Sequence, residues 1–225
     1  MSDRKKNGDT RHMTKAILFD LDGTLTDSGE GITKCAQYAF QKLNLKSPSL
    51  DDLRIFVGPP LARSFAQKGV PKEKIDTAIT YFRERYQTIG KYENIPYHGI
   101  KELLAQLKNE GYQLFTATSK PEILAKEILS HFELDSYFVA ICGASLDHSR
   151  ETKEAVIAYL LKKYPIQNAI MIGDTSFDVY GAAKFNIPCI GVDWGYGNCS
   201  DMKKAGAITT VSSIDELYNN LHHFF

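Results

Sequence analysis

The chain has 225 residues, and its 27 basic and 27 acidic side chains give a formal net charge of zero. This balance argues against a general affinity for nucleic acid or for an anionic membrane, because both need a basic excess. Charged residues at 24% and apolar residues at 43% are ordinary for a globular protein, which excludes a chain that is disordered throughout.

Residues 1–12 contain no large apolar side chain except Met1. We therefore expect a disordered leader outside the fold, with a native flexible tail as the alternative. The four cysteines, at positions 35, 142, 189 and 199, form no C-x-x-C pair, and the apolar runs are far too short to span a bilayer. These features predict a reduced, cytoplasmic protein.

A short apolar run at 16–19 predicts the first strand, and the next stretch, 28–95, contains only helical periodicity. Its expected helices span 32–43, 60–68 and 71–89. After Pro96, apolar strand-like runs alternate with helical segments, which is typical of a parallel sheet covered by helices on both faces. The expected strands are 113–118, 138–142, 169–172 and 188–192, and the expected helices are 100–109, 122–131, 151–164, 178–186 and 214–221.

We therefore predict an α/β fold with a Rossmann-like parallel sheet, built from residues 13–27 and 96–225. Residues 28–95 interrupt the alternation directly after the first strand. We expect them to form an inserted helical cap.

Polar side chains follow several of these strands at the point where each strand ends. In an open parallel sheet, ligands bind outside the carboxyl ends of the strands. Residues from distant parts of the sequence should therefore meet at one edge. The candidates are Asp20 and Asp22 after the first strand, Thr118 and Ser119 at the end of the second, Lys153 at the start of a helix, and Asp174 and Asp178 after the fourth strand.

Four carboxylates in one crevice repel one another unless a cation lies among them. Oxygen-only ligands of this kind suit Mg²⁺, which binds carboxylates together with a substrate phosphate. A cation, a lysine and hydroxyls also form a receptor for a phosphoryl group. One carboxylate can attack phosphorus to form an aspartyl-phosphate, and a second, two residues on, can donate and recover a proton.

Each of these residues also has a plainer interpretation. An Asp after an apolar run is usually a turn or N-cap residue, and most lysines, Lys120 included, are expected to be solvated. A calcium loop starting at Asp20 needs Gly at its sixth position and Glu at its twelfth, where this chain has Leu25 and Gly31. The segment 194–197 either walls the pocket or is a glycine-rich turn.

Four segments resemble the motifs of the haloacid-dehalogenase-like superfamily of phosphatases. They are FDLDGTLTD at 19–27, ATSKP at 117–121, the lysine of SRETKEAVIAYLL, and GDTSFDV at 173–179. The sequence is most similar to the phosphoglycolate-phosphatase-like and bacterial 5′-nucleotidase-like branch, through VGPPLARSF, FRERYQTIGKYENIPYHGI, CGASLDHSRETK and VDWGYG.

The resemblance implies that Asp20 is the nucleophile and an Mg²⁺ ligand. It implies that Asp22 is the general acid and base and also binds Mg²⁺ through its backbone carbonyl. Thr118, Ser119 and Lys153 would hold the phosphoryl oxygens. Asp174 would bind Mg²⁺, and Asp178 would support the metal site indirectly.

The expected substrate is a small phosphorylated metabolite, similar to phosphoglycolate or a 5′-nucleotide, and the cap is expected to select it. Arg63 and Arg85 are candidate contacts for its leaving group, although arginines in such positions are more often solvated helix residues. A sugar-phosphate mutase of the same superfamily and a non-catalytic phospho-accepting signalling module remain alternatives. Asp22 disfavours a dehalogenase, and no cap lysine marks a phosphonatase. The sequence leaves the oligomeric state open, as monomer or dimer.

Overall fold

Six parallel strands form the central sheet of the computed structural model, which describes residues 15–147 and 149–225. The order across the sheet is β5-β4-β1-β6-β7-β8, and each neighbouring pair is parallel. The strands are β1 (Lys15–Phe19), β4 (Gln113–Pro121), β5 (Ala140–Ala144), β6 (Asn168–Gly173), β7 (Cys189–Val192) and β8 (Thr209–Val211). The predicted α/β class is confirmed, whereas the expected leader at 1–12 lies outside the described residues.

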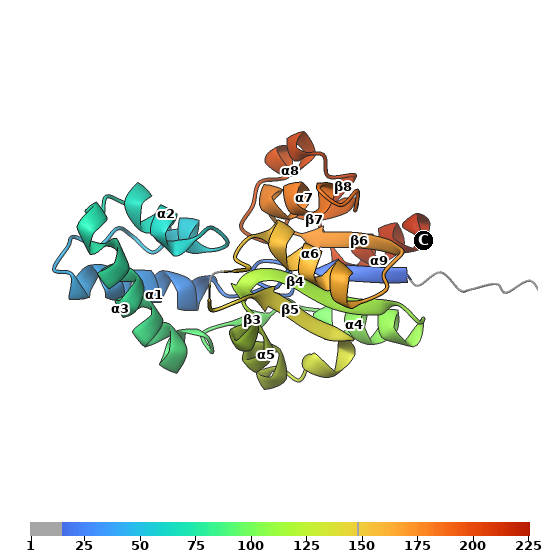
Figure 1. The fold of residues 1–225 in the computed structure, drawn as a ribbon, viewed down its shortest axis with the longest axis horizontal. Coiled ribbons are helices and arrows are strands. Elements are labelled where there is room, and N and C mark those ends of the chain that lie inside the picture. Colours follow the sequence, from blue (N-terminus) through green and yellow to red (C-terminus); the bar gives the residue numbers. More distant parts are fainter. Residues whose placement is uncertain (1–14, 148) are drawn as a thin grey trace, which may run out of the picture.

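Helices cover both faces of the sheet (Figure 1). One face packs against α4 (Ile100–Asn109), α5 (Glu122–His131) and α9 (Ile214–Phe224), and the other against α6 (Lys153–Lys163), α7 (Ser176–Ala183) and α8 (Cys199–Ala205). Strand β1 shows why its sequence reads as continuously apolar. Ile17 and Phe19 belong to the first apolar cluster and Ala16 and Leu18 to the second, because alternate side chains of a strand point to opposite faces.

The chain leaves the sheet after β1 and forms a separate group of helices beyond the end of the strands (Figure 1). This helical unit, residues 28–95, has its own buried apolar cluster, distinct from those on the two faces of the sheet. Its elements are α1 (Gly29–Lys42), η1 (Asp52–Phe56), α2 (Leu61–Gln67), η2 (Lys72–Lys74), α3 (Ile75–Arg85) and the π-helical turn η3 (Tyr86–Gly90). The antiparallel pair β2 (Thr26–Asp27) and β3 (Ile95–Pro96) joins the unit to the core.

Several elements differ from the sequence-based expectation. Helix α8 and strand β8 were not predicted, since seven and three residues are too few to show a periodicity. The short β2–β3 pair and the 3-10 segments, including η4 (Asp135–Tyr137), were missed for the same reason. Strand β4 continues past 118 through an irregular register to Pro121. Within the part of the chain that the structure describes, no helix is both long and apolar enough to cross a membrane.

Candidate active site

The loop that follows β1 is shaped by two buried leucines and one glycine. Leu21 and Leu25 are fully buried and anchor the loop in the core. Gly23 has φ +84°, and a Cβ atom at this position would lie 2.3 Å from a carboxylate oxygen of Asp174. The sequence Asp-Leu-Asp-Gly-Thr-Leu therefore turns tightly beside Asp174, and it leaves Asp20 at the carboxyl end of β1.

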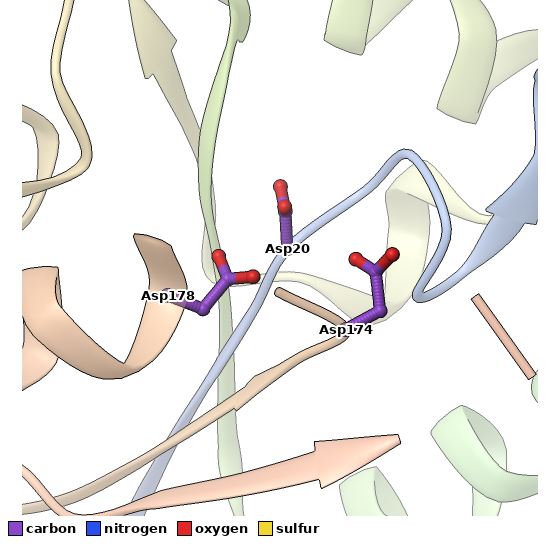
Figure 2. A group of neighbouring side chains, drawn as sticks. All are labelled: Asp20, Asp174 and Asp178. Atoms are coloured by element: carbon purple, nitrogen blue, oxygen red, sulfur yellow. The ribbon is translucent and has the colours of Figure 1, made fainter. Parts of the chain in front are cut away.

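Three carboxylates meet at this edge of the sheet (Figure 2). One oxygen from each of Asp20, Asp174 and Asp178 lies within 4.8 Å of the others, and all three residues are buried. Asp20 follows β1 and Asp174 follows β6, its neighbour in the sheet, while Asp178 lies on α7. The parallel order of β1 and β6 thus brings together residues that are more than 150 positions apart, as the sequence predicted.

Lys153 bridges two of these carboxylates. Its ammonium lies 2.9 Å from Asp20 and 2.6 Å from Asp178, and it also donates a hydrogen bond to the carbonyl oxygen of Ala117 at 2.8 Å. Thr152 caps α6 by accepting a hydrogen bond from a backbone amide, so the helix begins at Lys153 and directs this residue into the core. Lys153 is 5% exposed, which removes it from the class of solvated surface lysines.

Burial dominates the electrostatics of the site. It raises the pKa of Asp174 to about 8, with further contributions from the negative charges of Asp178 and Asp20. Burial also raises the pKa of Asp20, although the Lys153 ammonium opposes this. The pKa of Lys153 is itself raised despite its burial, because Asp178 and Asp20 stabilise its charge. The group therefore has more carboxylate than its single lysine can neutralise.

The donor set fits a hard divalent cation. Asp178 is already engaged on both oxygens, since one lies next to Lys153 and the other accepts hydrogen bonds from the amide and hydroxyl of Thr175 at 3.0 and 2.8 Å. Asp178 has the Lys153 ammonium as a close partner, whereas the hydrogen-bond donors on Asp174 are neutral and Asp20 contacts Lys153 through one oxygen, so the negative charge of Asp20 and Asp174 is the part of the group that a cation would offset. Thr24 and the amide of Tyr196 fix Asp174 by donating to its two oxygens at 3.2 and 2.8 Å.

Asp22 is held by a second buried lysine. The ammonium of Lys120 donates to both of its carboxylate oxygens, at 2.8 and 2.6 Å. The expectation that Lys120 is a solvated residue at a helix start was wrong, because Lys120 is 8% exposed and its partner is 98 residues away in the sequence. Thr118 is buried next to Lys120. The Thr118 hydroxyl partly opposes the rise in the pKa of Asp20 that burial causes, whereas Ser119 is partly exposed.

A cavity of about 490 Å³ opens between the helical unit and the core loops, and its lining includes Thr175, the residue after Asp174, but not the carboxylates themselves. The helical unit contributes Arg54, Ile55, Val57, Pro59, Arg63 and Gln67, and the core contributes Thr175–Phe177, Gly195–Asn198 and Asp201. The segment at 194–197 therefore lines a pocket at three of its four residues. A Cβ atom on Gly195 would lie 2.3 Å from the Cβ of Asp174, so the close approach of this loop to the carboxylates requires glycine.

The two candidate arginines lie in different places. Arg63 is exposed and lines the cavity. Arg85 instead forms a two-pronged ion pair with Glu93, with nitrogen–oxygen distances of 2.6 and 3.0 Å. Thr24, Arg54 and Tyr196 also contribute to the site, and none of the three was predicted individually. No local pattern marks them, because their partners are set by the tertiary fold.

Comparison with known proteins places the chain in a family. The model of the haloacid dehalogenase-like hydrolase family matches residues 17–192. The chain belongs to this family. The predicted resemblance is thereby confirmed, and the four motif segments of this hydrolase lie at one edge of its sheet.

Relatives of the hydrolase carry different names. It is 43% identical over 190 residues to a 5′-nucleotidase of Pseudomonas aeruginosa, covering 83% of this chain and 86% of that protein. It is 38% identical over 205 residues to the tyrosine-protein kinase PtkA of Mycobacterium tuberculosis, covering 89% and 70%. A crystal structure of a predicted phosphatase from Clostridium acetobutylicum superimposes with a TM-score of 0.89 at 46% identity, covering 94% and 99%.

Proposed function

We propose that this hydrolase is an Mg²⁺-dependent phosphatase that cleaves a small phosphomonoester through an aspartyl-phosphate intermediate on Asp20. The observation that carries the proposal is the placement of Asp20, at the carboxyl end of the central strand and in contact with the buried ammonium of Lys153. The family match and the relatives named as a 5′-nucleotidase and a phosphatase support the phosphatase class.

The first step forms a bond between a carboxylate oxygen of Asp20 and phosphorus, and it breaks the bond between phosphorus and the leaving-group oxygen. Asp22 gives a proton to that oxygen, so the alcohol departs neutral. In the second step Asp22 takes a proton from water, whose oxygen attacks phosphorus and releases phosphate and the Asp20 carboxylate. Lys153 and Thr118 hold the phosphoryl oxygens, with Ser119 at the edge of this group.

Asp20 and Asp174 would hold Mg²⁺ through their carboxylates and Asp22 through its backbone carbonyl, with Asp178 as an indirect support. When bound, the ion supplies positive charge that offsets the repulsion among the carboxylates and the charge of the phosphate. The chain's own contribution is to fix these ligands: Thr24 and the Tyr196 amide orient Asp174, and Thr175 orients Asp178.

We assign the helical unit, residues 28–95, as a cap that selects the leaving group. The cavity between this unit and the core has a volume of about 490 Å³, which is enough for a small metabolite, and it borders the loop at Thr175 that follows Asp174. Its walls combine the cations Arg54 and Arg63 with the apolar side chains of Ile55 and Val57 and the ring of Tyr196. Such a lining suits a polar or anionic leaving group that also has an apolar face, as 5′-nucleotides have.

The test is phosphate release from a panel of phosphomonoesters that includes 5′-nucleotides, phosphoglycolate and sugar phosphates, with and without Mg²⁺. We expect many turnovers per enzyme molecule with inorganic phosphate as the product, and none for Asp20→Asn. Isomerised sugar phosphate without release of phosphate would indicate a mutase instead. A single stable phosphorylation without turnover would indicate a signalling module.

A further inference from the structure

Lys120, which binds the proposed general acid Asp22, also contacts the helical unit. The Lys120 ammonium that holds Asp22 also lies over the ring of Tyr86, 5.0 Å from the ring centroid. Tyr86 is 5% exposed, and its hydroxyl as well as its ring lies close to the Lys120 ammonium. A desolvated ammonium over an aromatic face is attracted by the charge distribution of the ring. Tyr86 is therefore a contact from the helical unit to the lysine that binds Asp22.

The position of Tyr86 is itself tightly fixed. Its ring stacks on Phe82, with centroids 5.6 Å apart and an interplanar angle of 14°. It begins the π-helical turn, and Gly90 at the other end of that turn packs so closely on α1 that a Cβ on Gly31 would lie 2.0 Å from the Gly90 carbonyl oxygen. Insertions of this kind in helices are frequent at functional sites. The turn thus packs tightly against α1, while the Tyr86 side chain contacts Lys120 of the core.

We propose that Tyr86 is a positioning residue that acts through Lys120: in the reacting state its ring holds the ammonium against one oxygen of Asp22, and this contact aims the other oxygen, which carries the proton, at the leaving-group oxygen. Proton donation then depends on the cap being seated over the core. This proposal rests on the proposed function, in which Asp22 is the general acid. Tyr86 does not touch the reacting atoms, so its effect should fall on the step that needs a proton donor.

The experiment compares two leaving groups. An alkyl phosphate from the substrate panel leaves as a basic alkoxide and needs the proton from Asp22, whereas p-nitrophenyl phosphate leaves as a stable anion and needs it little. Loss of a cation–π contact to a desolvated ammonium corresponds to about a 30-fold change in an equilibrium. We expect Tyr86→Leu to lower kcat for the alkyl phosphate by about 10- to 30-fold and kcat for p-nitrophenyl phosphate by less than about 3-fold.

Two further variants isolate the ring and its partner. Tyr86→Phe keeps the ring and should restore the activity on the alkyl phosphate. Adding Tyr86→Leu to Lys120→Met should cause no loss beyond that of Lys120→Met alone, because the tyrosine acts through the lysine. Tyr81→Leu is the matched control: Tyr81 lies on α3, the helix that leads into the π-helical turn, with Lys42 5.9 Å from its ring centroid, and its removal should leave both activities unchanged.

An equal loss on both substrates would show that Tyr86 only supports the structure, and it would overturn the proposal. No loss on either substrate, or full additivity with Lys120→Met, would overturn it as well. Asp22→Asn separates this failure from failure of the proposed function. If the wild-type enzyme turns over and Asp22→Asn shows the leaving-group dependence while Tyr86→Leu does not, only the role of Tyr86 is wrong. If Asp22→Asn shows no such dependence, the general acid is misassigned and both proposals fail.

Discussion

Replacement of Lys153 by methionine tests the electrostatic account of the site most sharply. Methionine keeps an unbranched apolar stem but removes the ammonium that neutralises Asp20 and Asp178 and that donates to the Ala117 carbonyl. Removing one partner of a buried ion pair leaves an uncompensated charge and costs about 3–5 kcal/mol of folding free energy. We expect a loss of this size for the metal-free protein at pH 7.

The loss of folding free energy in Lys153→Met is limited by the cost of protonating a carboxyl, since a neutral carboxyl no longer needs the ammonium. In the unfolded chain a carboxyl with a pKa near 4 takes up a proton at pH 7 at a cost of about 4 kcal/mol, so protonation of Asp20, whose pKa burial already raises, limits the loss to about that value. At pH 5 the same uptake costs only about 1.5 kcal/mol. The destabilisation should therefore shrink to about 1–2 kcal/mol at pH 5, and Mg²⁺ should reduce it at pH 7 by supplying positive charge.

The assay is urea unfolding of wild-type protein, Lys153→Met and Lys162→Met, at pH 5 and pH 7, each with EDTA and with saturating Mg²⁺. Lys162 lies on the same helix and is exposed, so Lys162→Met should change the free energy of unfolding by no more than about 0.5 kcal/mol. The reasoning is refuted if metal-free Lys153→Met is as stable as wild type at pH 7, or if its destabilisation is the same at both pH values.

Three further predictions concern activity and metal binding. Asp20→Asn should lower kcat by several orders of magnitude without changing the circular dichroism spectrum, because within residues 15–147 and 149–225 no second nucleophile is placed to replace it; near-normal turnover would contradict this. The pKa of Asp174 lies at about 8 without metal, and a folded pKa above the unfolded value means that this group's contribution to stability is lost as pH rises from about 4 to about 8. Mg²⁺ needs the ionised form, so calorimetry in buffers of different ionisation enthalpy should show proton release on Mg²⁺ binding at pH 7, and pH-independent binding without release would refute the assignment. Arg63→Ala should raise KM for the preferred substrate by about 10-fold but leave p-nitrophenyl phosphate nearly unchanged, whereas Arg83→Ala, on the exposed side of the cap, should change neither; equal effects of the two variants would remove Arg63 from the substrate pocket.

The sequence was sufficient to predict which residues gather at the sheet edge. Asp20 and Asp174 each follow an apolar strand, and parallel strands necessarily bring their carboxyl ends to the same side. Lys153 was singled out only because the aspartates were expected nearby and because it matches the third motif of the family resemblance. The structure supplies the reason that it differs from a surface lysine, namely two carboxylates within 2.9 Å.

Residues whose environment depends on contacts between the cap and the core could not be predicted in the same way. Lys120 reads as an ordinary lysine, and only the packing of Asp22 and Tyr86 around it makes it buried. The partner of Arg85 is Glu93, which lies beyond the π-helical turn. Hydrophobic periodicity reports which face of a helix is buried, but it does not report which polar groups that face will meet.

The stereochemical course of phosphoryl transfer tests the central claim most directly. Each in-line displacement inverts the configuration at phosphorus, so two displacements through an aspartyl-phosphate on Asp20 restore it. With a phosphorothioate monoester made chiral at phosphorus by 18O and hydrolysed in 17O-labelled water, the account predicts inorganic thiophosphate with retained configuration. Inverted configuration would show that water attacks the substrate directly, and it would contradict a nucleophilic role for Asp20.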